Sequence, residues 1–177
     1  MANSEQLEYL QDSADDWKVY RREHAITRPD LRGADLSAAE LPGADLSGAD
    51  LAGADLTNAN LANADLSGAN LSGAYLLNVV LSGSNLAGAD LTGANLTEVN
   101  AANANLTDAT LTGAILGGAN LANADLTNAI LHQADLGGAN LTSATLLQAD
   151  LTEANLADVN LSRADLTGVI GLNLSER

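Results

Sequence analysis

One sequence feature constrains this chain more than any other: an apolar residue stands at every fifth position from Leu31 to Leu166, without an insertion. These positions number 28, of which 27 are Leu and one is Ala101. The residue two places earlier is small and nearly always Ala, and the residue between them is usually Asp or Asn. Gly and Asn are frequent two places after the Leu. An internal repeat this regular decides the fold class.

Neither an α-helix nor a straight strand can gather these Leu side chains on one side. Five residues advance a helix by about 500°, so successive Leu side chains would spread around the cylinder. On a strand, an odd spacing places successive side chains on opposite faces. The chain must therefore turn once per repeat. Gly or Asn two places after the Leu fits this, because both accept the positive φ of a tight turn.

Four such turns close a square coil, and stacked coils pair backbone to backbone at about 4.8 Å. We therefore predict an all-β fold, a quadrilateral parallel β-helix (β-solenoid) of about seven coils with a height of roughly 34 Å. Leu and the preceding Ala face the axis, and the Asp or Asn between them faces solvent. The absence of Phe fits so narrow a core. At Ala101 the axis should either have space or be filled by neighbouring residues, and if a cavity exists, Ala101→Leu should stabilise the protein.

The tandem strings Ala-Asp-Leu-Ser-Gly and Ala-Asn-Leu-Thr-Asn resemble the pentapeptide-repeat family, over residues 29–170. This resemblance implies a right-handed, four-sided coil. It also implies functional themes, since family members that resemble DNA in shape and charge bind DNA gyrase. The uniform Leu, the unbroken register and the lack of axial Phe differ from that subgroup. They are closer to the many members without an assigned function, particularly cyanobacterial ones.

Residues 1–28 do not repeat and are predicted to form an N-terminal helical cap. Segments 4–10 and 15–23 read as short helices, and Ser13 with Asp16 resembles a capping box. An uncapped solenoid end exposes axial Leu side chains and unpaired strand edges. Many family members similar to cyanobacterial ones carry such a Trp-containing leader. The apolar residues expected to cover the end are Leu7, Leu10, Trp17 and Tyr20. The alternative is a helix that docks a partner.

The solenoid is predicted to span residues 29–171 and to be followed by a tail, residues 172–177. The register breaks at Gly171, which occupies a Leu position. The tail is too short for a helical cap. Two alternatives stay open: a homodimer through the C-terminal coil, or a small self-capping turn around Leu172 and Leu174.

The outward positions before each Leu carry the variable chemistry. Seven of the first eight are acidic, whereas the third predicted coil has none and offers apolar residues instead. Residues 29–170 have 16 acidic and 2 basic residues, about one net charge per 2.4 Å of predicted length against about 1.7 Å in duplex DNA. From Asn100 to Asn160 one column should form an amide ladder. The candidate partner surface comprises Asp30, Asp35, Glu40, Asp45, Asp50, Asp55, Asp65, Tyr75, Leu77 and Val80.

Nothing in the sequence indicates catalysis, a metal or a cofactor. Cysteine is absent, which excludes disulfides and thiolate metal sites, and His24 and His132 have no nucleophile–base pattern around them. The start of the chain has no secretory signal pattern and no apolar run approaches a membrane span, so we expect a cytoplasmic protein. The net charge of −16 argues against nucleic acid and anionic membranes as direct partners.

The sequence thus favours a non-catalytic structural or interaction protein that binds a still unknown protein partner through its solenoid faces. The alternative is an acidic DNA mimic that regulates a type II topoisomerase, DNA gyrase.

Overall fold

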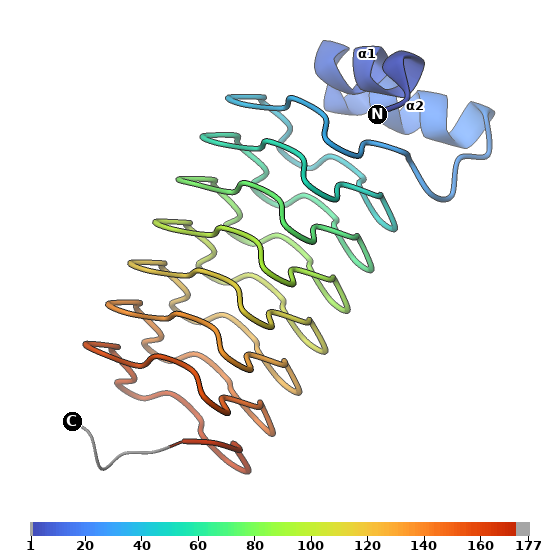
Figure 1. Cartoon of the computed structure of the whole chain (residues 1–177). Helices are drawn as coiled ribbons and strands as arrows, with labels where there is room; N and C mark the ends of the chain where they lie inside the picture. The colour runs from blue at the N-terminus through green and yellow to red at the C-terminus, as the bar shows by residue number, and fades with distance from the viewer. Residues whose placement is uncertain (1, 173–177) are drawn as a thin grey trace.

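A computed structural model describes residues 2–172 of the chain, and in it two short helices precede a long stack of coils (Figure 1). Helix α1 spans Ser4–Asp12 and helix α2 spans Ala14–Glu23. Ser13 lies between them and caps α2, because its side chain accepts a hydrogen bond from Asp16 N–H at 3.0 Å. None of the helices among these residues has the length and apolar character needed to cross a membrane.

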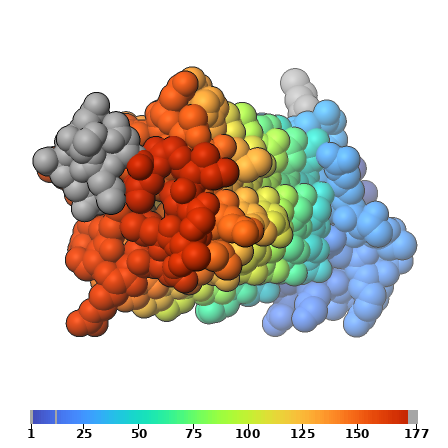
Figure 2. Space-filling view, turned by 90° about the horizontal axis from the view of Figure 1, so that it is seen from below, coloured from blue at the N-terminus to red at the C-terminus, as the bar shows by residue number. Residues whose placement is uncertain are grey.

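Parallel bridges between residues twenty positions apart hold the coils together. They run without interruption from Asp30 with Asp50 to Asp150 with Ile170, and a new one begins every five residues. Each turn of the chain therefore has four sides, and each side contributes one bridge. Leu31 N–H donates to Asp50 O and Asp50 N–H donates to Pro29 O, both at 2.8 Å. Figure 2 shows successive coils layered along one axis, with the C-terminal coil nearest the viewer.

The tight turns at the corners of each coil explain the residue types found two places after the Leu. Ala34 N–H donates to Leu31 O at 3.1 Å, which closes a four-residue turn, and Gly33 within it has a φ of 60°. Asn58 occupies the equivalent position with a φ of 60°, so the positive φ predicted two places after the Leu is confirmed. Only a few residue types adopt this conformation cheaply, which selects Gly and Asn here.

The outward Asp or Asn has a structural task that the sequence pattern alone did not indicate. Asp35 Oδ1 accepts hydrogen bonds from Ser37 N–H at 3.1 Å and from its hydroxyl at 2.7 Å. The same contact between an Asx oxygen and the N–H two residues later recurs along the solenoid, as at Asn105 and Asp165. This is an Asx turn, and it fixes the corner that follows. A short carboxylate or amide before a Leu therefore stabilises the corner that follows, although the same position also accepts Tyr75, Ile115 and Ile130.

The axis is filled by the Leu residues and by the small residue two places before each of them, and from Leu31 to Leu151 these side chains are buried apart from the half-buried Ala39. Fully burying one Leu contributes on the order of 1.5–3 kcal/mol. Ser84 replaces an inward Ala, and its hydroxyl donates to Leu81 O at 2.6 Å. No buried side-chain polar atom of the described residues lacks a partner.

Ala101 is also buried on the axis, on the side that carries Leu81 and Leu121 in the coils before and after it. The residue two places before Ala101 is unusual as well, which the period of five did not indicate. Val99 occupies the inward position of the same repeat, where nearly every other repeat has Ala, and it is buried as well. We expect the larger Val99 to fill part of the space that the smaller Ala101 leaves, although Val79 occupies the same position one coil earlier beside a full-sized Leu81.

We expect Val99 and Ala101 to be energetically coupled. Val99→Ala alone should cost about 2 kcal/mol of stability, because it leaves two small residues on one side of the axis. Ala101→Leu should stabilise the Val99→Ala variant more than the wild-type chain, with a coupling of about 1 kcal/mol. Urea unfolding of the four chains of this double-mutant cycle measures the coupling. Equal effects of Ala101→Leu in both backgrounds would contradict the expected filling of this space.

Candidate functional site

The first coil presents backbone carbonyls toward the N-terminal end, where no earlier coil can donate to them. Helices α1 and α2 lie across this end and supply the donors (Figure 1). Three of the outward carbonyls of the first coil receive hydrogen bonds from residues 2–23: Asp30 O from Asn3 N–H at 2.8 Å, Asp35 O from Gln11 Nε2 at 3.3 Å, and Asp45 O from Trp17 Nε1 at 2.6 Å. The helices therefore terminate the sheet edge through specific polar contacts.

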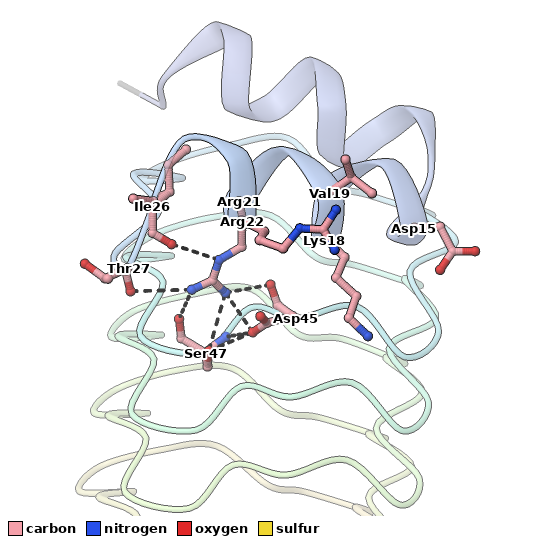
Figure 3. Close-up of a pocket in the computed structure, with 10 residues that line it drawn as sticks. Asp15, Lys18, Val19, Arg21, Arg22, Ile26, Thr27, Asp45 and Ser47 are labelled. Atoms are coloured by element: carbon pink, nitrogen blue, oxygen red, sulfur yellow. Dashed lines mark hydrogen bonds and ion pairs between the residues drawn. The ribbon is translucent and has the colours of Figure 1, made fainter.

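Arg21 connects α2 most closely to the solenoid. Its side chain is only 9% exposed, and it forms an ion pair of 2.7 Å with the Asp45 carboxylate. It also donates to Asp45 O at 2.8 Å and to Ser47 O at 3.1 Å (Figure 3). Its Nε donates to Ile26 O at 3.2 Å, which holds the segment that leads into the first coil. The sequence pattern did not indicate Arg21, because its only local signal is the spacing of one helical turn from Trp17.

The apolar residues predicted to cover the end lie between the helices and the first coil. Leu10, Trp17 and Tyr20 are buried in the continuous core, and Leu7 is half-buried against it. Tyr9 stacks on the Tyr20 ring with centroids 4.1 Å apart. The leader thus adds aromatic packing that the solenoid interior lacks.

The acidic candidate residues lie on all four sides of the coil, and on three of these sides they form stacked pairs. Asp30 bridges Asp50 and Asp35 bridges Asp55 on two of the sides. On the other two sides, Glu40 bridges Asn60 and Asp45 bridges Asp65. This arrangement brings like charges close together on neighbouring coils and does not gather them into a single stripe.

Several of these carboxylates already have a charged or hydrogen-bonding partner. Arg32 contacts the Asp30 carboxylate at 3.0 Å and the Asp50 carboxylate at 3.6 Å. Asn85 Nδ2 donates to Asp65 Oδ1 at 3.1 Å. The Asp45 carboxylate is paired with Arg21. The acidic surface near the first coils therefore has weaker exposed charge than the residue count suggests.

Local hydrogen bonds lower the pKa of particular carboxyl groups. The Arg32 guanidinium holds the pKa of Asp30 below its ordinary value. At Asp35 the cause is different, since the Ser37 hydroxyl and N–H stabilise the carboxylate and lower its pKa. The pKa of Asp165 is lowered in the same way by the Thr167 hydroxyl. Hydrogen bonds to the charged form favour ionisation.

The candidate apolar residues Tyr75, Leu77 and Val80 wrap around one corner. Tyr75 bridges Asp55 and Asn95, whereas Val80 bridges Asn60 on the neighbouring side; Leu77 lies in the turn between them. Tyr75 is 57% exposed, and Leu77 and Val80 are half-buried.

The side that carries Tyr75, here named the Tyr75 face, gains a second exposed apolar residue. Asn95 bridges Ile115, which is 45% exposed, so Tyr75 and Ile115 stand two coils apart on one side. In order along the axis, the Tyr75 face consists of Asp35, Asp55, Tyr75, Asn95, Ile115, Asp135 and Asn155. The step of twenty residues already places Ile115 in the column of Tyr75, and the bridges confirm that position.

The amide ladder predicted for one column is present over part of its length. Asn120 Nδ2 donates to Asn100 Oδ1 at 3.1 Å, and Asn140 Nδ2 donates to Asn120 Oδ1 at 3.2 Å. Elsewhere such ladders end on a carboxylate, as where Asn155 Nδ2 donates to Asp135 Oδ1 at 2.8 Å. These contacts link neighbouring coils and give the ladder a structural task.

At the other end of the stack, the last axial residues are less covered. Leu156, Leu161 and Leu166 are half-buried, in contrast to the buried Leu residues of the earlier coils. Of the predicted tail, Leu172 is half-buried and residues 173–177 lie outside the described part of the chain. The self-capping turn around Leu172 and Leu174 falls partly on those residues, and pairing of two copies through this coil stays a prediction.

Within residues 2–172, no group of three or more His, Asp or Glu side chains is arranged to hold a metal ion. His24 belongs to the helical end, where its Nδ1 lies 3.0 Å from Tyr20 O, and His132 follows an axial Leu far along the solenoid.

The contact between Ser37 and Asp35 predicts a measurable pH effect. A lowered pKa in the folded state contributes stability above the ordinary Asp value of about 3.9, and that stability is lost as the pH falls through the folded pKa. Ser37→Ala should therefore raise the pKa of Asp35 and reduce the loss of stability in acid. An NMR titration of the Asp35 carboxyl measures this directly.

Ser72→Ala is the matched control, because the Ser72 hydroxyl donates to the neutral amide of Asn70 at 2.7 Å. It should leave the pH dependence of stability unchanged. An unaltered Asp35 pKa in Ser37→Ala would show that the hydroxyl does not stabilise the carboxylate.

Comparison with known proteins agrees with this geometry. The family model of pentapeptide repeats matches residues 30–68, 64–100, 104–142 and 134–170. A search of curated proteins found no match. Among solved structures, HetL from the cyanobacterium Nostoc sp. strain PCC 7120, a pentapeptide-repeat protein involved in the regulation of heterocyst differentiation, is 36% identical. The match covers 80% of this chain and 74% of HetL, with a TM-score of 0.47.

A second similar structure is that of a trypsin-treated variant of QnrB1, a plasmid-mediated fluoroquinolone resistance protein. It is 25% identical, and the match covers 79% of this chain and 78% of that one, with a TM-score of 0.63. The family match covers well over half of the chain. This chain therefore belongs to the pentapeptide-repeat family, whose members fold as right-handed quadrilateral β-helices.

Proposed function

We propose that this chain is a non-catalytic interaction protein that binds a protein partner through the Tyr75 face. The observation that carries this proposal is the pair of exposed apolar side chains, Tyr75 and Ile115, on one side of a rigid rod. Exposed Tyr is a frequent anchor in protein interfaces, since its ring buries a large area with little loss of conformational entropy.

The charge pattern around these anchors supports the proposal. Residues 66–89 contain no charged side chain, and this uncharged band is longer than one turn of twenty residues. Along the Tyr75 face, Asp55 precedes Tyr75 and Asp135 follows Ile115. On this face Tyr75, Asn95 and Ile115 are uncharged and stand between two carboxylates, as in interfaces with an apolar core and a polar rim, and Glu98 lies in the turn after Asn95.

This pattern defines the partner by its chemistry. The partner should present an apolar group to Tyr75 and Ile115, and basic side chains to Asp55 and Asp135. Four steps between coils separate these two carboxylates, which corresponds to about 19 Å at the usual strand spacing. Two Lys or Arg residues at that separation, with an apolar centre between them, would match the face.

We expect Tyr75→Asp and Ile115→Asp each to weaken capture of the partner by about tenfold or more, because both place a charge in the uncharged centre. Affinity capture from an extract of the source organism at two salt concentrations, followed by titration with the purified partner, measures this. Ile130→Asp is the matched control: Ile130 is 43% exposed but bridges Thr110 and Asp150 on the neighbouring side.

The Tyr75 face is the binding site if Ile130→Asp retains the partner while the other two variants lose it. Equal retention by all three variants, or equal loss, would place the interaction elsewhere. Higher salt should weaken binding only in part, since the rim charges are screened and the apolar contact is not.

A second candidate function is regulation of DNA gyrase by mimicry of DNA. The similarity to QnrB1, a fluoroquinolone resistance protein, favours this candidate, as does the net charge of −16. We place it second because Arg32 and Arg21 neutralise part of the acid near the first coils, and because the remaining carboxylates lie on all four sides.

A supercoiling assay with purified DNA gyrase separates the two candidates. The interaction proposal predicts no change in supercoiling, or in its inhibition by a fluoroquinolone, at micromolar concentrations of this protein. Protection or inhibition that persists in Tyr75→Asp and is lost when Asp35 and Asp55 are both changed to Asn would support mimicry instead.

A further inference from the structure

A pocket of about 740 Å³ lies between α2, residues 25–27 and the first coil (Figure 3). This volume is within the range of about 300–1,000 Å³ that is usual for small-molecule sites. Arg21, Asp45 and Ser47 line it where they join α2 to the solenoid. Their mutual hydrogen bonds make that wall of the pocket rigid.

The pocket collects positive charge on an acidic protein. Five of the seven basic residues of the chain fall between residues 18 and 32, and three of these line the pocket: Lys18, Arg21 and Arg22. The two acidic residues in its lining are Asp45, which is paired with Arg21, and Asp15, which Figure 3 shows at the far end.

Lys18 and Arg22 are the cations available to a ligand. They are four residues apart on α2 and therefore project from the same side of the helix, and both are exposed. Neither side chain forms a hydrogen bond or an ion pair with another described side chain or backbone group. Two like charges at this spacing repel each other, and an anion placed between them would remove that cost.

Of the four remaining lining residues, three are apolar and the fourth is Thr27. Ala25, Ile26 and Val19 contribute to the pocket, and Val19 is 41% exposed. Exposed charges separated by more than about 8 Å are largely screened at physiological ionic strength, so most of the carboxylates of the solenoid act only weakly at this end. The pocket therefore combines two adjacent cations with an apolar wall.

From this combination we infer that the pocket binds a small organic anion, namely a carboxylate or a phosphate ester attached to an apolar body. Lys18 and Arg22 hold the anionic group, and Val19 with Ile26 contacts the apolar body. This site is separate from the Tyr75 face, and it requires neither a partner protein nor gyrase.

Titration of the full chain with phenyl phosphate, benzoate and inorganic phosphate, followed by ¹⁵N–¹H NMR, tests the inference. Saturable shifts should be confined to residues 15–27 and 45–47. At least one of the two aromatic anions should bind more tightly than inorganic phosphate, because only the aromatic anions can use the apolar wall. The stronger of the two identifies the anionic group as phosphate or carboxylate.

Lys18→Gln combined with Arg22→Gln should weaken this binding at least tenfold. Arg163→Gln is the matched control, since Arg163 is an exposed basic residue near the opposite end of the solenoid. Circular dichroism of each variant verifies that the fold is retained. The inference is overturned if no probe gives saturable shifts, or if the double variant binds as tightly as the wild-type chain.

Discussion

Backbone hydrogen bonding between coils is the constraint on which the rest of this structure depends. Each side of a coil contributes a single parallel bridge to the next coil. Strand pairing therefore occurs only between coils, and each coil is held by the coils before and after it. That pairing keeps one register only if every repeat has the same length, which is why no insertion interrupts residues 31–166. Leu on the axis and the Asx turns at many of the corners both stabilise this register. Repeats of this kind derive their stability from nearest neighbours.

The same constraint makes the two ends different from the middle. At the N-terminal end, the helices replace a missing coil with donors to the carbonyls of Asp30, Asp35 and Asp45, and Arg21 anchors them. At the C-terminal end, the last axial Leu residues are only half-buried. Function is left to positions that the register does not use. The positions that we propose for function are the exposed side chains of the Tyr75 face and the pocket between α2 and the first coil.

The interior could be predicted from the sequence because a strict period leaves one geometry that gathers all its apolar residues. Positive φ at Asn58, burial of Ala101 and the side on which each acid lies all follow from counting in fives and twenties. Contacts that do not recur from repeat to repeat could not be predicted from the sequence. Arg21 reaches Asp45 across 24 residues, and nothing in the local sequence indicates that pairing. The pocket beside it depends on how the leader packs, which propensity and hydrophobic pattern do not specify.

Native-state hydrogen exchange tests most directly whether neighbouring coils and the helical end hold the rod together. Leu36 and Leu46 N–H donate to Asp55 O and Asp65 O at 2.7 Å near the capped end. Asn155 and Asp165 N–H donate to Ala134 O and Ala144 O at 2.9 Å near the open end. The free energy of local unfolding is lowest for a coil that pairs with only one neighbouring coil. At concentrations where the chain is monomeric, Leu36 and Leu46 should exchange at least about tenfold more slowly than Asn155 and Asp165. Equal protection at both ends, or stronger protection at Asn155 and Asp165, would contradict this account.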